Sequence, residues 1–197
     1  MEMIKQIKTA CMLLILFTLF TGFIYPVIIT GIAQLLFSWQ ANGSFIQDRG
    51  KNRGSLLIGQ SFTNATYFWS RPSATTPFPY NASNSSGSNL GPSNPIFLNT
   101  VNDRVAALRK ADPSNHNPIP VDLVTASGSG LDPEISPMAA LYQVPRIAKA
   151  RGVSETQLET LIQNLVIPRT LWILGEPRVN ILQLNLALDQ LEKNTHA

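Results

Sequence analysis

The loop Ser127-Gly128-Ser129-Gly130 is one place in this chain where residue types and spacing suggest binding chemistry. Successive backbone N–H groups in such a small-residue loop can form a nest that holds an anion. A tight turn between a strand and a helix uses the same residue types, so the pattern also fits a purely structural turn. We take Ser127 and Gly128 as candidate binding positions.

A second candidate pair lies on the segment that follows this loop. Gln143 and Arg146 are three residues apart, so on a helix they share one face. An amide and a guanidinium placed there can bind a ribose or a phosphate, and they can equally form a polar docking face.

Asp132 and Glu134 also lie close together, but acid–base catalysis by paired carboxylates needs a cleft and a raised pKa. Their plainer role is to place negative charge at the start of the next helix.

The sequence lacks the motifs of the common enzyme classes. It contains no GxxxxGK[ST] phosphate loop, no GxGxxG after a strand and no zinc-type spacing of cysteine and histidine. His116 and His196 are far apart and are predicted to be solvated, and the one cysteine, Cys11, lies in an apolar run. A membrane-anchored hydrolase that uses Ser127 or Ser129 stays open, although no base is suitably placed. We expect no catalytic residue, no metal ligand and no firmly bound cofactor.

The elements that must position these residues begin with a membrane segment. No charged residue occurs between Lys8 and Asp48, and residues 10–32 form an almost wholly apolar run of 23 residues. A helix needs about 20 such residues to cross a bilayer. We therefore predict a single transmembrane helix at 10–34, preceded by a short basic tail at 1–9.

A cleaved signal peptide is the alternative for this segment. Lys5 and Lys8 supply a basic start, and Gly31-Ile32-Ala33 is a weak cleavage site that would release a secreted binding module. The apolar run is longer than a signal core, so we favour an uncleaved anchor. The basic residues beside its N-terminal end indicate a cytoplasmic N-terminus and an extracytoplasmic domain.

Charge limits the partners of the remaining chain. The 197 residues carry 15 basic and 12 acidic side chains, a net charge of +3, and residues 9–197 carry only +2. This surplus is too small and too scattered for a nucleic-acid footprint. We expect no nucleic-acid partner.

The part of the chain beyond the membrane segment is predicted to be an ordered α+β (mixed α/β) domain at 54–197, joined to the membrane helix by a linker at 35–53. Residues 54–102 carry a single charge, Arg71, and seven aromatic residues, which is the reverse of a disordered composition. Periodicity and capping signals predict helices that begin at Asn94-Pro95, Ser136-Pro137, Ser154 and Val179, and short strands at 54–60 and 120–124.

The aromatic, charge-poor stretch at 62–97 is predicted to form part of a docking surface. Charge placed there, for instance by Phe68→Asp, is then expected to release the chain from a larger complex. Further on, Pro145 must kink or split the helix that starts at Ser136-Pro137.

Five segments carry a resemblance to a known family. They are GSLLIGQ (54–60), YFWSRPSA (67–74), YNASNSSGSNLGPSNP (80–95), DLVTASGSGLDPEISPMAALYQVPRIAKARG (122–152) and GEPRVNILQLNLALD (175–189). Together they closely resemble the C subunits of the bacterial Kdp potassium-transporting ATPases, the KdpC family. The resemblance covers nearly the whole chain, and SGSGLDPEISP followed by QVPRIAKARG is a long, gapless pattern.

The resemblance implies membership of a four-part complex in the bacterial inner membrane. Its other members are a channel-like subunit that selects potassium, a P-type ATPase subunit that hydrolyses ATP, and a small membrane subunit. The C subunit is an accessory needed for assembly and activity. The sequence agrees, since it lacks the DKTGT phosphorylation motif and any potassium-filter signature.

Two roles are proposed for such subunits, and the resemblance carries both to this chain. In the first, the subunit is a catalytic chaperone that raises the ATP affinity of the pump, and Gln143 matches the glutamine that touches nucleotide, with Ser127 and Gly128 as further candidates. In the second, an extracytoplasmic domain docks over the channel-like subunit without nucleotide contact. Because an extracytoplasmic domain cannot meet cytoplasmic ATP, the two roles conflict, and the predicted topology favours the second.

Overall fold

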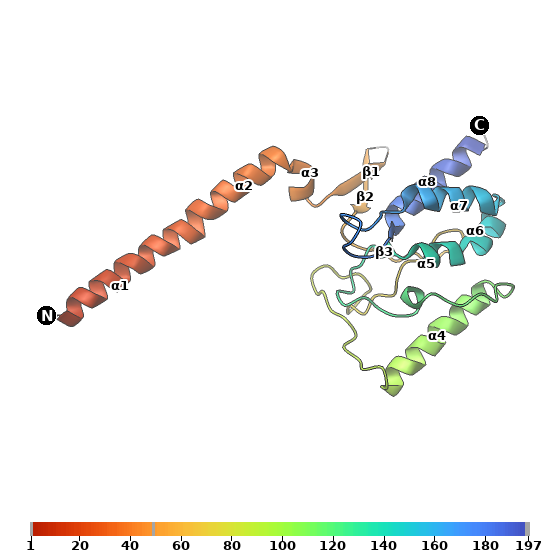
Figure 1. Ribbon diagram of the computed structural model, residues 1–197, viewed down its shortest axis with the longest axis horizontal. Helices are drawn as coiled ribbons and strands as arrows, with labels where there is room; N and C mark the ends of the chain where they lie inside the picture. Colours follow the sequence, from red (N-terminus) through yellow and green to blue (C-terminus); the bar gives the residue numbers. More distant parts are fainter. Residues whose placement is uncertain (1, 49, 196–197) are drawn as a thin grey trace. The chain divides into compact units, whose positions relative to one another are not determined.

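The computed structural model describes residues 2–48 and 50–195, and side chains as far as residue 191 (Figure 1). Arg49, which belongs to the predicted linker, and His196 lie outside the described residues. The chain divides into two compact units, Met1–Phe45 (unit 1) and Ile46–Ala197 (unit 2).

Unit 1 is built around one continuous apolar helix. It comprises α1 (Glu2–Leu19), a π-helical segment (Phe20–Ile24) and α2 (Tyr25–Leu36). At 35 residues it is long enough, and over much of its length apolar enough, to cross a membrane. Its wider π-helical turn precedes Pro26, which lacks an N–H and whose ring crowds the carbonyl of Gly22 four residues earlier. The predicted transmembrane residues 10–34 lie inside this helix.

The segment predicted as a linker has structure of its own. It contains the short helix α3 (Ser38–Ala41) and a two-stranded ribbon of β1 (Phe45–Asp48) and β2 (Lys51–Ser55). Within the ribbon, Arg53 pairs with Asp48 at 2.9 Å.

The regular secondary structure of unit 2 is mainly helical, with very little sheet. Its helices are α4 (Pro95–Ala111), α5 (Pro137–Tyr142), α6 (Val144–Arg151), α7 (Glu155–Leu165) and α8 (Ile181–Thr195). Strands β3 (Glu134–Ile135) and β4 (Val179–Asn180) pair antiparallel, with Ile135 opposite Val179. The predicted fold class, an α+β domain with a single N-terminal apolar helix, is confirmed.

Three of the predicted helix signals correspond to real helix starts, whereas the last helix begins at Ile181 and not at Val179, because Val179–Asn180 form β4. The Asn94 side chain accepts a hydrogen bond from the Ile96 N–H at 2.9 Å and so starts α4. Ser154 and Gln157 form the reciprocal capping box at the start of α7. The helix that contains Pro145 is split at Gln143 into α5 and α6, as predicted, and α6 stops where Gly152 adopts φ +69°.

Both strand predictions in unit 2 are wrong. The predicted strand at 54–60 ends at Ser55, because Gly54 takes φ +152° and the chain then turns. The predicted strand at 120–124 is a single 3₁₀ turn, Val121–Leu123. Leu123 and Val124 are consecutive and both buried, which a strand on one face of a core cannot achieve because its side chains alternate.

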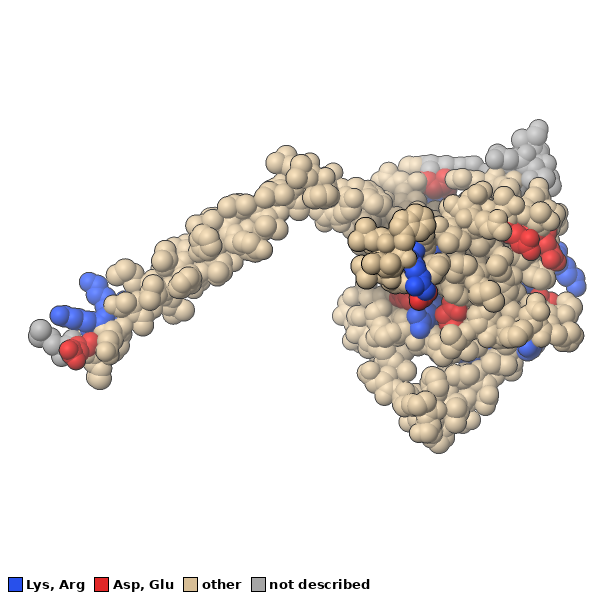
Figure 2. Space-filling view, viewed as in Figure 1, with Lys and Arg blue, Asp and Glu red and all other residues tan. Residues whose placement is uncertain are grey.

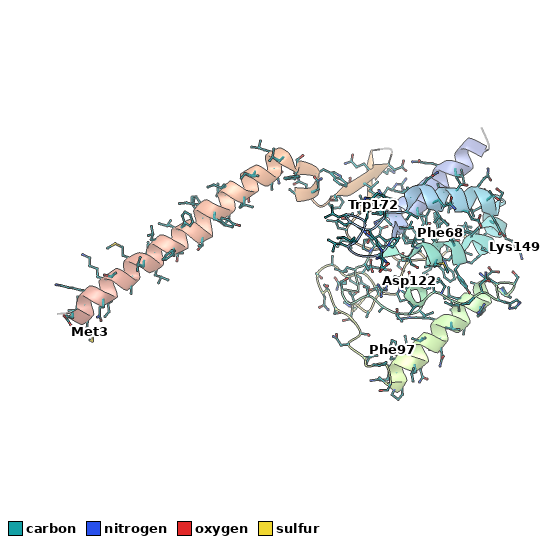
Figure 3. All side chains as sticks on the ribbon, viewed as in Figure 1. Met3, Phe68, Phe97, Asp122, Lys149 and Trp172 are labelled. Atoms are coloured by element: carbon teal, nitrogen blue, oxygen red, sulfur yellow. The ribbon has the colours of Figure 1, made fainter. Side chains whose placement is uncertain are left out.

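The prediction that the aromatic stretch at 62–97 forms a docking surface is wrong for its N-terminal part, around Phe68. Phe68 has no exposed surface and lies in the core of unit 2 (Figure 3). Asn185 on α8 holds it by accepting from the Phe68 N–H at 2.9 Å and donating to the Phe68 carbonyl at 3.0 Å. Tyr67 and Trp69 also pack against the core. Residues 62–72 therefore form a strap across the helices, and Phe68→Asp would act by unfolding the unit.

Candidate functional site

Gln143 lies at the junction of α5 and α6, where Pro145 interrupts the helix. Its side chain has only 2% of its surface exposed. The amide oxygen accepts from the Trp69 N–H at 2.7 Å and from Arg146 Nη2 at 2.7 Å. The amide nitrogen donates to the carbonyls of Trp69 and Ala139, both at 3.2 Å. The whole hydrogen-bonding capacity of the amide is therefore directed to the chain itself.

Arg146 is the second member of the predicted pair, and it does share a face with Gln143. It is buried, donates to the carbonyls of Ala65 and Tyr67, and stacks over the Trp69 ring with its guanidinium carbon 4.3 Å from the ring centroid. Burial lowers the pKa of Arg146 to about 10. The pair thus fixes the strap onto α6, which is a structural use of both side chains.

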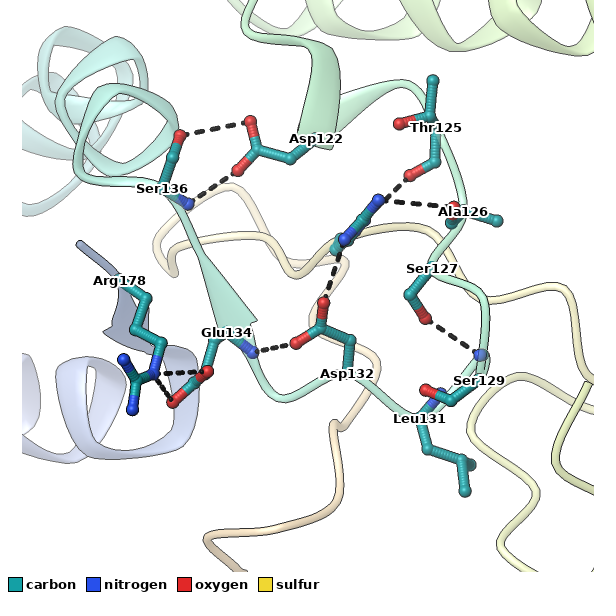
Figure 4. A network of polar contacts seen from close by, with 12 residues as sticks. Asp122, Thr125, Ala126, Ser127, Ser129, Leu131, Asp132, Glu134, Ser136 and Arg178 are labelled. Carbon is teal, nitrogen blue, oxygen red and sulfur yellow. Dashed lines mark hydrogen bonds and ion pairs between the residues drawn. The ribbon is translucent and has the colours of Figure 1, made fainter. Parts of the chain in front are cut away.

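The loop of residues 127–130 is closed by its own hydrogen bonds. Ser127 is buried and its Oγ accepts from the Gly130 N–H at 2.9 Å (Figure 4). The Ser129 carbonyl accepts from the Ser86 N–H at 3.0 Å, which packs the loop against the segment around Gly87. A Cβ on Gly87 would approach the Gly128 carbonyl oxygen to 2.9 Å. This geometry fits the tight-turn interpretation of the loop.

The paired carboxylates each have an arginine partner. Asp132 pairs with Arg71 at 3.0 Å, and Glu134 pairs with Arg178 at 2.9 Å (Figure 4). Asp132 also accepts from the Glu134 N–H at 3.0 Å, so it shapes the turn into β3. Both carboxylates therefore have structural roles.

These ion pairs line a groove of about 550 Å³ in unit 2. Its walls come from residues 120–122, 132–138 and 176–178, together with Arg71. Arg71 joins the strap to the 125–132 loop, since it also donates to the Thr125 carbonyl at 3.2 Å. Neither Arg71 nor Trp69 is among the binding residues predicted from the sequence, although both organise this region. The signal available was that Arg71 is the only charge in 49 residues.

The remaining candidates give no catalytic arrangement within the part of the chain that the structure describes. Neither Ser127 nor Ser129 has a histidine or carboxylate partner there, and His116 is exposed. No group of three or more histidine, cysteine, aspartate or glutamate side chains among those residues can hold a metal ion.

The amino-acid sequence closely matches one known family of proteins. Residues 7–190 match the family described as "KdpC: K+-transporting ATPase, c chain". A relative from Herpetosiphon aurantiacus, named potassium-transporting ATPase KdpC subunit, is 58% identical over 94% of this chain and 96% of its own length. Relatives of the same name from Methylococcus capsulatus and Geobacter sulfurreducens are 57% and 55% identical, over 96% and 95% of this chain and 100% and 98% of their own lengths. The chain therefore belongs to the KdpC family of potassium-transporting ATPase subunits.

Proposed function

We propose that this chain is a non-catalytic accessory subunit of an ATP-driven potassium uptake complex in the bacterial inner membrane. The long apolar helix anchors it, with the N-terminus cytoplasmic and unit 2 extracytoplasmic. Unit 2 docks on the potassium-channel-like subunit and supports its assembly with the P-type ATPase subunit and the small membrane subunit. In this role the chain makes no contact with nucleotide.

The observation that carries this proposal is the burial of Gln143. A side chain that recognises ATP must present free donors or acceptors to it, whereas the Gln143 amide bonds to Trp69, Ala139 and Arg146. Exposing it would leave the Trp69 backbone groups without partners, at a cost of about 1–3 kcal/mol for each buried group. This favours the docking role over that of a catalytic chaperone.

Membrane topology gives the direct test. Cys11 is the only cysteine, so a Cys11→Ala background allows single reporters at Glu159 and Ser93, which are both exposed in unit 2. We expect a membrane-impermeant thiol reagent to label both reporters once the outer membrane is opened. Ser127 is unsuitable as a reporter because it is buried. Labelling of both positions only after the inner membrane is broken would place unit 2 in the cytoplasm and contradict the proposal.

A kinetic experiment separates the two roles at Gln143. Gln143→Met removes the amide but keeps the length, and Gln163→Met makes the same change on the exposed surface of α7. We expect Gln143→Met to lower the melting temperature of the chain and the yield of assembled complex, with the KM for ATP of the assembled complex unchanged. A raised KM for ATP with an unchanged melting temperature would instead support nucleotide contact.

A further inference from the structure

The loop between α7 and β4 carries an exposed apolar tip that the function described so far does not use. The tip consists of Leu171, Trp172, Ile173 and Leu174, whose exposed fractions run from 56% to 83%; Figure 3 labels Trp172. Trp172 is the most exposed of the four. Below the tip, Thr170 and Leu174 form an antiparallel bridge, and Arg169 pairs with Glu176 at 2.5 Å. The tip is therefore an ordered turn, and the charged residues Arg169 and Glu176 flank it.

The backbone of the tip is unfavourable for the residues that occupy it. Leu171 and Trp172 have φ +52° and +67°, and the Ile173 N–H donates to the Thr170 carbonyl at 3.3 Å. Two central residues with positive φ are the mark of a type I′ turn, for which Asn-Gly is preferred. Strain of this kind is associated with functional sites. Large apolar side chains at these positions destabilise the turn and lower the solubility of the chain. Their presence therefore indicates that the tip contacts another molecule.

The chain leads directly from the tip into the wall of the groove described above. After Gly175 the chain enters the groove wall at Glu176, Pro177 and Arg178, and Val121 and Met138 also line the groove while each is 69% exposed. An exposed apolar tip that leads into a groove lined by both apolar and charged residues resembles a protein interface, in which a tryptophan commonly supplies the anchor.

The charges argue for a protein partner over a lipid surface. Around the tip and groove, Arg169, Arg71 and Arg178 are paired with Glu176, Asp132 and Glu134 respectively. These three ion pairs leave no surplus positive charge among them to attract anionic headgroups. The face of unit 2 seen in Figure 2 likewise shows small groups of both signs in a mostly uncharged surface.

The chain itself restricts where the partner lies. The apolar helix ends at Leu36 and unit 2 begins at Ile46, so at most about 35 Å of fully extended chain joins them. We propose, resting on the function above, that residues 171–174 with Val121 and Met138 form the surface that docks an extramembrane segment of the potassium-channel-like subunit of the complex. That segment is uncharged and apolar where it meets the tip.

The test replaces the tip by the sequence that its turn prefers. Leu171→Asn with Trp172→Gly removes both apolar side chains and relieves the backbone, so the isolated full chain in detergent should be as stable as the parent, or more so. Recovery of the chain with a tagged P-type ATPase subunit in detergent should fall roughly tenfold, since anchors of this kind contribute more than 1.4 kcal/mol. Met138→Gln, on the groove side, should also reduce recovery. Ile96→Asn is the matched control, since Ile96 is an exposed apolar residue on α4.

Each outcome decides between explanations. Loss of recovery with the tip variant, but not with Ile96→Asn, supports the docking surface. Full recovery of the tip variant overturns it, and if that variant also loses binding to protein-free vesicles, the tip contacts lipid instead. Equal losses with the tip variant and Ile96→Asn would show a general need for apolar surface and would also overturn it. If the parent chain is not recovered with the ATPase subunit at all, the proposed function fails as well, which is a distinguishable result.

Discussion

At the scale of single residues, unit 2 depends on side chains that hold the 62–72 strap against the helices. Phe68 inserts into the core, Asn185 bonds its backbone on both sides, and Gln143 does the same for Trp69. In each case an amide side chain pairs with a backbone N–H and a backbone carbonyl, much as a neighbouring strand would. The strap thus satisfies buried backbone groups without belonging to a sheet.

Phe68→Ala is expected to reduce the free energy of unfolding by about 3–5 kcal/mol, because it empties a fully buried aromatic site. Phe78→Ala is the matched control, since Phe78 is 56% exposed on the same stretch and should change the free energy by less than about 0.5 kcal/mol. Urea unfolding of the full chain in detergent, followed by circular dichroism, measures both. Similar losses for the two variants would contradict the core assignment of Phe68.

Tyr80 should make the chain sensitive to alkali. Burial raises the pKa of Tyr80 to about 12 from its ordinary value of 10, and its hydroxyl donates to the Arg71 carbonyl. Between pH 10 and 12 the unfolded chain releases this proton while the folded chain keeps it, so the contribution to stability is complete below pH 10 and is lost as the pH rises through 12.

The comparison of the parent with Tyr80→Phe isolates this effect. The parent should lose up to roughly 2 kcal/mol more stability than the variant between pH 9 and pH 11.5, since one pKa unit corresponds to about 1.4 kcal/mol. Urea unfolding at the two pH values gives the difference. Equal losses in the parent and the variant would exclude Tyr80 as the group responsible.

At the scale of elements, local start and stop signals set the helix ends. The capping box at Ser154 lets us predict that Ser154→Ala costs about 1 kcal/mol, because the N–H of Gln157 loses its acceptor. Thr156→Ala, two residues on and exposed, should be neutral or slightly stabilising because alanine has the higher helix propensity. Thermal unfolding of the two variants side by side measures the difference. If both variants melt alike, the box does not stabilise α7.

At the scale of the whole molecule, the two units are expected to be independent in folding. Among the residues that the structure describes, the buried apolar cluster of unit 2 runs from Phe68 to Leu188 and contains no member of residues 1–45. A fragment of residues 46–197 should therefore melt within a few degrees of the full chain in the same detergent, while losing its partition into membranes. Differential scanning calorimetry and flotation with vesicles measure the two properties. An unfolded fragment would show that unit 2 needs residues 1–45.

The amino-acid sequence by itself determined those features that depend on neighbours within a turn or two. The apolar helix, the caps at Asn94 and Ser154 and the split at Pro145 follow from short patterns, because helical hydrogen bonds and capping contacts join residues at most four apart. The placement of Gln143 and Arg146 on one face was predictable for the same reason.

Only the tertiary structure decided what those faces touch. Gln143 meets Trp69 across 74 positions, Arg71 meets Asp132 across 61, and Asn185 meets Phe68 across 117. Composition correctly indicated that the aromatic stretch is ordered, yet the same apolar side chains suit a core or an interface equally well. The choice between them depends on the space left between α5, α6 and α8, which long-range packing alone creates.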